Sequence, residues 1–249
     1  MQVGFIGAGN MARAMARGLG DPVLCSDGGS GRAAALAQEL GGRAASNVEV
    51  ASEAELVILC HKPAQFEDIA REIGGHAKAV ASVVGSISND MLSAAYPNRP
   101  VFRLMPNTPV EVRQGVICYS PAASVDVSVE QDVITLLERL GSVIVVPERL
   151  LGAATAVMGV GPAYQALVAE AQVDAAVRHG LKPNLAGRLV AETMAGTAAL
   201  LAARDYDTLA VRREVTSPGG TTARGLDALE RGGVRGAFQA AADRVLEAH

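Results

Sequence analysis

The N-terminal segment constrains the fold of this chain more than any other. A short apolar run, 3–6, is followed at once by the series Gly7-Ala8-Gly9-Asn10-Met11-Ala12. After a buried strand, the pattern G-x-G-x-x-A allows a tight turn at its first glycine and a close approach of the main chain to a pyrophosphate at its second. Its third small residue lets the following helix, here expected over 11–19, pack closely on the strand. The phosphates then lie on free N–H groups at the positive end of that helix. The segment therefore predicts a dinucleotide site that includes Gly7, Gly9, Asn10 and Met11.

The first 147 residues alternate short β-rich runs with helical stretches. Strands are predicted at Gln2–Ile6, Val23–Ser26, Leu56–Cys60, Ala79–Val84, Val101–Leu104, Val116–Tyr119 and Val143–Val146. Several are continuously apolar, which is typical of strands buried on both faces of a parallel sheet. Helical spacing appears between them, for example at 33–40 and 129–140. We therefore expect an α/β fold: an N-terminal Rossmann-like doubly wound sheet over residues 1–147.

From residue 148 to 249 the pattern changes to Ala, Leu, Glu and Arg, with little β-branched alternation. Pro162 suits the first turn of a long helix that reaches about His179, and Gly180 is placed to end it. Asn184 suits the start of a second helix, to about Ala203. With no Trp and only 3% aromatic residues, few large side chains can close a monomer core. We therefore expect an all-α helical domain over 148–249 that binds substrate and packs on its own chain or on a second copy, as a homodimer or larger homo-oligomer.

Composition and residue spacing limit the classes of partner and ligand that we expect. The net charge is −4, with 22 basic and 26 acidic residues and no basic block, so a nucleic-acid partner is not expected. No uninterrupted apolar run reaches the roughly 20 residues of a membrane span, so a membrane is not expected either. The three cysteines and the four histidines (His61, His76, His179 and His249) lack metal-ligand spacing, so we expect no metal. Without an export signal, the cysteines indicate a reducing, cytoplasmic setting.

The end of the second predicted strand bears on the choice of cofactor. Asp27 lies 20 residues after Gly7, where an acid binds the adenosine ribose hydroxyls and favours NADH. Ser30 and Arg32 follow closely and are able to receive the 2′-phosphate of NADPH. Alternatively, Asp27 is only a turn residue before Gly28. The sequence leaves NADPH and NADH both open.

A second candidate site lies near the C-terminus, in Thr216-Ser217-Pro218-Gly219-Gly220-Thr221-Thr222 before a helix predicted over 223–229. Gly219 and Gly220 leave main-chain N–H groups uncovered, and the hydroxyls of Ser217, Thr221 and Thr222 accompany them. Such a helix start suits a small anion such as a substrate carboxylate, although an ordinary hydroxyl cap is the alternative.

Taken together, the segments resemble the pyrroline-5-carboxylate reductase family, in order and across nearly the whole chain. The resemblance is carried by Gly4–Ala12, Lys62-Pro63, Met105-Pro106-Asn107-Thr108-Pro109, Gly161-Pro162-Ala163-Tyr164 and, most specifically, Thr216–Thr222. It implies NADPH or NADH as hydride donor, a cyclic imine carboxylate as substrate and L-proline as product. It further implies that Ser217, Gly220, Thr221 and Thr222 hold the substrate, that Asn47 contacts the adenosine ribose, and that Lys62 and Pro63 lie along the ribose and nicotinamide side.

The chain departs from the family pattern at three places. Met158-Gly159-Val160-Gly161 replaces Ser-Gly-Ser-Gly, Cys60-His61 replaces a small apolar pair, and Gly28 stands where many members have an arginine. Thr222 is the expected catalytic residue, through a hydrogen bond to the imine nitrogen; no obvious general acid accompanies it, so catalysis is expected to be mainly orientation. The alternatives are a piperideine carboxylate reductase, a deazaflavin-dependent NADP reductase, and a reductase-like nucleotide-binding protein that has lost turnover.

Overall fold

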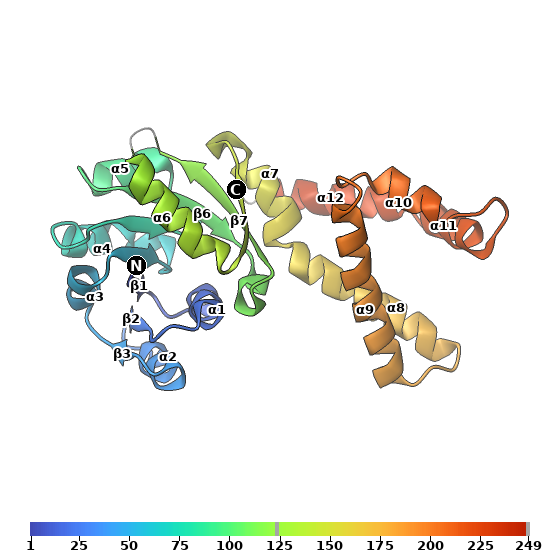
Figure 1. The fold of residues 1–249 in the computed structure, drawn as a ribbon, viewed down its shortest axis with the longest axis horizontal. Helices are drawn as coiled ribbons and strands as arrows, with labels where there is room; N and C mark the ends of the chain where they lie inside the picture. Colours follow the sequence, from blue (N-terminus) through green and yellow to red (C-terminus); the bar gives the residue numbers. More distant parts are fainter. Residues whose placement is uncertain (123–124, 248–249) are drawn as a thin grey trace. The chain divides into compact units, whose positions relative to one another are not determined.

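The computed structural model describes residues 1–122 and 125–247 (Figure 1). The chain divides into two compact units, one over Met1–Pro162 and one from Ala163 to the end of the described residues. His249, one of the isolated histidines, lies outside them.

The first unit is built on one eight-stranded sheet with the order β3-β2-β1-β4-β5-β6-β7-β8. The strands are β1 (Val3–Ile6), β2 (Leu24–Ser26), β3 (Arg43–Ala44), β4 (Leu56–Leu59), β5 (Val80–Ser82), β6 (Val101–Pro106), β7 (Gly115–Pro121) and β8 (Gly141–Val145). The order turns back at β1, between β2 and β4, which is the switch point where open α/β sheets bind ligands. All seven predicted strands are present, and the expected α/β fold is confirmed.

Three details differ from the sequence prediction. The edge strand β3 was not predicted, because two exposed residues give no apolar signal. The strand β7 pairs antiparallel with β6, so the sheet is not wholly parallel. The strand β6 extends two residues beyond the predicted Val101–Leu104, through Pro106, and Asn107 leads into a 3₁₀ turn over Thr108–Val112.

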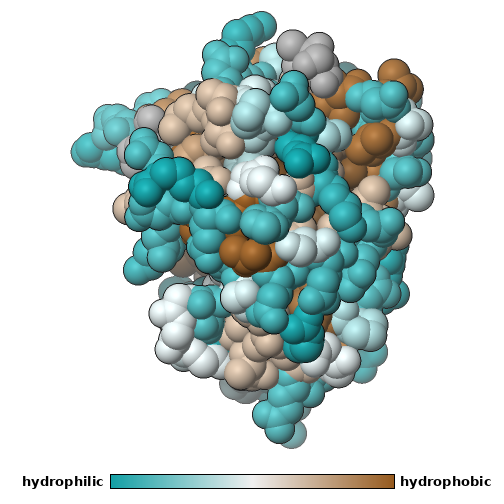
Figure 2. Space-filling view, turned by 90° about the vertical axis from the view of Figure 1, so that its left-hand side faces the viewer, coloured by the Kyte–Doolittle hydropathy of each residue, from teal (hydrophilic) through white to brown (hydrophobic). Residues whose placement is uncertain are grey.

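Helices cover both faces of this sheet. One core packs side chains from α1 (Asn10–Leu19), α2 (Arg32–Leu40) and α6 (Val127–Glu138) against the sheet, and includes Met15, Leu36 and Leu137. The other packs α3 (Asn47–Glu53), α4 (Phe66–Ile73) and α5 (Asn89–Ala95), and includes Ile73 and Leu92. The outer side of this unit is mainly hydrophilic, with small hydrophobic patches between polar side chains (Figure 2). Most large apolar side chains of the first unit are thus buried in its own two cores.

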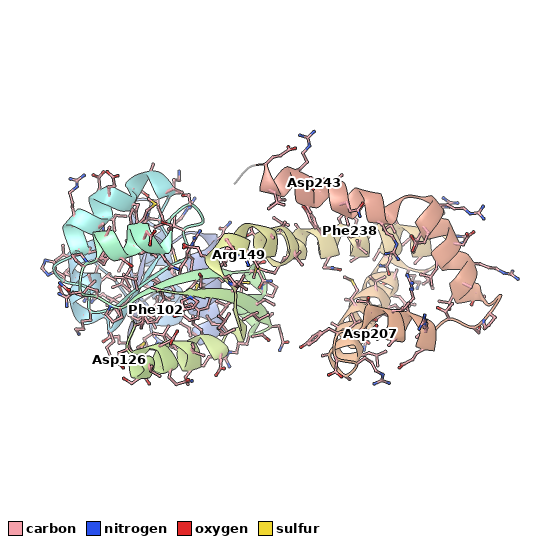
Figure 3. All side chains as sticks on the ribbon, turned by 90° about the horizontal axis from the view of Figure 1, so that it is seen from above. Phe102, Asp126, Arg149, Asp207, Phe238 and Asp243 are labelled. Atoms are coloured by element: carbon pink, nitrogen blue, oxygen red, sulfur yellow. The ribbon has the colours of Figure 1, made fainter. Side chains whose placement is uncertain are left out.

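Past the sheet, the chain runs through α7 (Leu151–Ala154) and a π-helical turn over Thr155–Gly159 into α8 (Gly161–Arg178). The second unit then consists of the remainder of α8 with α9 (Pro183–Ala202), α10 (Thr208–Glu214), α11 (Thr221–Arg231) and α12 (Val234–Leu246). The two long helices match the prediction, and α11 begins two residues earlier than expected. Asp207 caps α10 in the same way that Asp126 caps α6 (Figure 3), each accepting main-chain N–H bonds of the first turn.

The second unit buries very little of its own surface. Among its described residues only Ala186 and Val211 are buried hydrophobic side chains, whereas Leu167 is 64% and Leu189 49% exposed. The ring of Tyr164 contacts that of Phe238 edge-on, with centroids 6.3 Å apart, and Arg212 pairs with Glu230. These contacts hold the helices without forming a core of the usual size.

Two helical stretches, Glu148–Arg178 and Pro183–Ala202, are long and apolar enough to cross a membrane by length and composition. Both stretches contain charged residues, so neither is an uninterrupted apolar run and neither was expected from the sequence. Length and composition are weak evidence by themselves, since core and interface helices pass the same test.

Candidate cofactor cleft and anion-binding turn

The carboxyl ends of β1, β2 and β4 open into a cleft of roughly 620 Å³, within the usual size range of ligand pockets. Its lining combines predicted residues with others that the sequence did not single out: Ile6, Gly7, Ala8, Gly9, Asp27, Gly28, Ser30, Arg32, Asn47, Cys60, His61, Lys62, Gln65, Asp68, Ile69 and Glu72. Residues from five separate segments thus meet at the switch point of the sheet.

The two motif glycines differ in what their missing side chains allow. Gly7 has φ +98°, and a Cβ there would lie 2.6 Å from the carbonyl carbon and oxygen of Cys60. Gly9 has φ −75°, and a Cβ there would meet nothing within 4 Å. Gly7 is thus required by the protein's own packing, whereas Gly9 keeps space open at the start of α1.

The start of α1 offers donors to a ligand. Its first N–H groups, from Asn10 onward, have no partner within the helix, and Arg13 is the first to bond back, to the carbonyl oxygen of Gly9. Ala12 is fully buried, so the helix lies close to the sheet as the motif requires. Free donors, the open space at Gly9 and the positive helix end fit a dinucleotide pyrophosphate.

Asp27 is engaged with its own loop. Its Oδ1 accepts from the N–H of Gly29 at 2.9 Å, and its Oδ2 accepts from the Ser30 hydroxyl at 2.8 Å and from the N–H of Ala33 at 3.0 Å. These bonds, that from Ala33 above all, lower the pKa of the Asp27 carboxyl. The carboxylate therefore stays ionised in the cleft while it closes the turn before α2.

Asn47 lies at the start of α3, fixed by a capping box between Ser46 and Glu49. Its Oδ1 accepts from the Ser26 hydroxyl at 2.6 Å, and its Nδ2 donates to Glu72 at 2.8 Å. The neighbours Ser26 and Glu72 were not predicted as part of the site. For Glu72 the sequence offers one signal of a role in the site: it lies four residues after Asp68, on the same face of a helix.

The loop after β4 supplies the remaining wall. Lys62 is exposed, and among the described residues its ammonium group has no ion pair or hydrogen bond, while Pro63 starts a 3₁₀ turn. The ring of His61 stacks on Phe66, and its Nδ1 lies 2.9 Å from the carbonyl oxygen of Lys62. The buried Nε2 has no partner among the described residues, and burial lowers the pKa of the imidazole.

The turn Ser217–Gly220 in the second unit, the candidate anion site, has a defined geometry. Gly220 donates its N–H to the carbonyl oxygen of Ser217 at 3.1 Å, and Gly219 has φ +70°. With Pro218 in between, these features define a type II turn. A Cβ on Gly220 would lie 2.3 Å from the Ser217 hydroxyl oxygen. Both glycines are therefore needed by the turn, and the N–H of Gly220 is not free as the sequence suggested.

Behind this turn, Thr221 and Thr222 form the first turn of α11, whose cap at Gly220 has no side-chain hydrogen bond. The main-chain N–H groups at this start lack helical partners, and Arg224 is the first to bond back to Gly220. Ser217, Thr221 and Thr222 are exposed, and their hydroxyls make no hydrogen bond with the described residues. Unlike them, Thr216 is tied to the carbonyl oxygen of Arg212. The turn thus gathers unpaired hydroxyls and N–H groups at a positive helix end.

Among residues 1–122 and 125–247, no group of three or more His, Cys, Asp or Glu side chains is placed to hold a metal ion. The cysteines are free; Cys25 and Cys118 are buried, and Cys60 is half-buried in the cleft wall.

A glycine-rich helix start at the switch point of a Rossmann-like sheet, followed by a helical unit, defines an oxidoreductase of the dinucleotide-binding class. Comparison with known proteins narrows this class. Residues 148–249 match the family model "Pyrroline-5-carboxylate reductase dimerisation", and residues 2–90 match "NADP oxidoreductase coenzyme F420-dependent". The chain is 34% identical to the pyrroline-5-carboxylate reductase of Mycobacterium tuberculosis, over 96% of this chain and 92% of that protein. The corresponding enzyme of Thermus thermophilus is also 34% identical, with 98% and 95% covered. The chain belongs to the pyrroline-5-carboxylate reductase family.

Solved structures agree with this assignment. The pyrroline carboxylate reductase of Plasmodium falciparum with NADP bound superposes with a TM-score of 0.86 at 25% identity, covering 99% of this chain and 96% of that one. The enzyme of Streptococcus pyogenes gives 0.88 at 29% identity, covering 99% and 97%.

Proposed function

We propose that this protein reduces 1-pyrroline-5-carboxylate to L-proline, with NADPH or NADH as the reductant. The observation that supports the proposal is that one chain combines a cleft whose helix start at Gly7–Met11 suits a pyrophosphate with a turn at Ser217–Thr222 whose free donors suit an anion. The first element is common to many dehydrogenases. Dinucleotide binding does not explain the second, and relatives at 34% identity over more than nine tenths of both chains carry the name of this reductase.

In the cofactor cleft, Gly9 and the N–H groups of Asn10 and Met11 would hold the pyrophosphate, and Asp27 and Asn47 the adenosine ribose. Lys62 and Pro63 would lie along the nicotinamide side. When bound, the dinucleotide supplies a hydride for the carbon–nitrogen double bond of the substrate.

At the second site, the N–H groups of Thr221 and Thr222 and the Ser217 hydroxyl would bind the substrate carboxylate, with Gly219 and Gly220 shaping the turn. The Thr222 hydroxyl would hydrogen-bond the imine nitrogen. A protonated imine is a much stronger electrophile, yet residues 216–222 contain no His, Asp or Glu. The proton would therefore arrive on the substrate or through water, and this chain would contribute mainly orientation.

The second unit is proposed to pack on a second copy of the chain, so that residues 148–249 serve substrate binding and dimerisation together. Three observations support this. The family model over these residues is a dimerisation model, and hydrophobic side chains of α8 and α9 are exposed. The pair Arg188–Glu192 lies within α9, where a bilayer would penalise both charges. The protein is thus proposed to be a soluble, cytoplasmic homo-oligomer.

A related substrate is the second candidate. Met158 and Val160 stand where the family has serines; both are half-buried, Met158 within the π-helical turn and Val160 directly after it. Loss of two hydroxyls favours a less polar ring, such as a six-membered piperideine carboxylate. The match of residues 2–90 to a deazaflavin-dependent NADP oxidoreductase model supports nucleotide binding, but gives no reason for Ser217–Thr222.

The test is oxidation of NADH and NADPH, followed at 340 nm by absorbance, with pyrroline-5-carboxylate and with piperideine carboxylates. We expect the highest kcat/KM with pyrroline-5-carboxylate. Faster turnover of a six-membered ring would favour the second candidate. Cofactor binding without oxidation in the presence of any ring would identify a nucleotide-binding protein that has lost turnover.

A further inference from the structure

We infer that this chain prefers NADH over NADPH, and that Asp27 at the end of β2 is the residue that selects between them. The inference rests on the proposed function only in that the ligand of the cleft is a nicotinamide dinucleotide. It concerns the 2′ position of the adenosine ribose, where the two cofactors differ by one phosphate group.

The Asp27 carboxylate has room for a hydrogen-bond donor but not for an anion. Three short-range hydrogen bonds, from Gly29, Ser30 and Ala33, hold it in place in the cleft lining. A carboxylate has about four acceptor positions, and Oδ1 uses only one of its two. A ribose hydroxyl can donate to the remaining position. A phosphate oxygen has no proton to donate there and would meet an ionised carboxylate instead.

The charge around Asp27 also disfavours a 2′-phosphate. The cleft lining contains the carboxylates of Asp27, Asp68 and Glu72 against the cations of Arg32 and Lys62. Glu72 accepts one N–H of the Asn47 amide at 2.8 Å, which leaves a single N–H on that nitrogen for a ligand and places a further carboxylate beside it. The lining thus carries one more carboxylate than cations before a phosphate monoester adds about two further negative charges at neutral pH.

The glycines that follow Asp27 provide no phosphate-binding side chain. Gly28 and Gly29 follow Asp27 directly and supply no cation, and Gly29 and Gly31 have positive φ, which a side chain would strain. Gly28 is different, because its φ is ordinary and a Cβ there would meet nothing within 4 Å. The loop therefore has room for a phosphate-binding side chain at residue 28 but does not carry one.

The experiment compares binding of NADH and NADPH by the purified full-length protein, without imine, from the change in nicotinamide fluorescence. For the natural chain we expect a Kd for NADH at least about tenfold below that for NADPH. The variant Gly28→Arg adds a cation without touching the Asp27 hydrogen bonds. It should tighten NADPH binding by about tenfold and change NADH binding by less than about twofold. Glu72→Gln should act in the same direction, more weakly.

A matched control is Gly75→Arg, which places the same charge on an exposed glycine that has open space around it and lies outside the cleft lining. It should leave the NADH to NADPH ratio unchanged. Asp27→Ser is the direct variant, but it also removes the cap of Ala33, so its folding must be checked by circular dichroism first.

Equal affinities, tighter NADPH binding by the natural chain, or no response to Gly28→Arg would overturn the inference. Failure to reduce any imine, together with preferential NADH binding, would instead overturn the proposed function and leave the inference standing.

Discussion

The Asn107 side chain joins the sheet to the helix that leads out of it: Nδ2 donates to the main-chain carbonyl oxygen of Met158 at 3.1 Å. Its Oδ1 accepts from the N–H of Val116 at 2.8 Å, and the residue is buried. Met158 lies in the π-helical turn, where Val160 bonds back five residues to Thr155 and the ordinary helical pattern is broken. Asn107 therefore supplies a partner that the widened turn does not provide, and π-helical turns often occur at functional sites.

We expect Asn107→Ala to lower the free energy of unfolding by about 1–3 kcal/mol, because two main-chain groups lose their partner in a buried place. Urea unfolding followed by circular dichroism measures this. Asn107→Asp keeps the acceptor for Val116 but replaces the donor to Met158 by a carboxylate oxygen, so we expect it to be at least as destabilising as Asn107→Ala. Gln114→Ala, an exposed neighbour, is the control, and a loss no larger than that of the control would contradict the assignment.

Gly7→Ala and Gly9→Ala should fail in different ways. At residue 7 the new methyl group collides with the Cys60 carbonyl and the backbone is left-handed, so stability should drop by several kcal/mol, on the order of a severe core defect. At residue 9 the methyl group meets no protein atom, so stability should stay within about 0.5 kcal/mol. Only the affinity for the dinucleotide should then fall. Thermal melts and cofactor titrations of both variants test this, and tight cofactor binding by Gly9→Ala would be the unexpected result.

Thr222→Val keeps the shape of the side chain and removes its hydroxyl. If this hydroxyl binds the imine nitrogen, kcat/KM should fall by about ten- to a hundredfold, the worth of a hydrogen bond to a charged partner. The Kd for the cofactor should not change, because Thr222 is not in the cleft lining. Thr222→Ser should keep most of the activity. An unchanged rate in Thr222→Val would remove Thr222 from the catalytic role.

His61 should make the protein sensitive to mild acid. Burial lowers the pKa of its imidazole below the value of about 6.5 of an unfolded chain. The unfolded state therefore binds the proton more readily, and the contribution of His61 is fully present above about pH 6.5. It is lost as the pH falls from there through the folded pKa, by at most about 1.4 kcal/mol per pH unit. Urea unfolding at pH 7.5 and 5.5 should show a smaller acid loss in His61→Gln than in the natural chain. His179→Gln, an exposed histidine, should behave like the natural chain.

The sequence predicted the elements that have a strong local signal. Continuous apolar runs such as 56–59 identified the central strands, and the Pro162 and Gly180 signals marked α8 closely. It missed β3, whose two exposed residues carry no such signal, and it missed the direction of β7, because apolar runs do not encode strand orientation. Asn107 lay in a recognised motif, but its partner is 51 residues away and is a main-chain atom, which no spacing rule reveals.

The candidate site shows the same division. Gly7 and Gly9 were predicted together as cofactor-binding residues. Their difference depends on the distance to Cys60, a residue far away in the sequence, so the motif does not show that packing requires Gly7 and that Gly9 leaves space for a ligand. Asp27 was predicted with two alternative roles, as a ribose ligand and as a turn residue, and its three local hydrogen bonds show that it closes the turn. Asp68 and Glu72 went unnoticed because acids on an exposed helix face usually only meet solvent.

The sparse interior of the helical unit has a consequence for how this protein is handled. If the proposed second copy completes the hydrophobic surface of this unit, its folding is governed by mass action, and its midpoint of unfolding rises with protein concentration. The sheet unit, which has two complete cores of its own, follows no such law. Dilution would then abolish turnover well before it abolishes nucleotide binding. An enzyme assayed at nanomolar concentration would lack reductase activity and still bind its coenzyme.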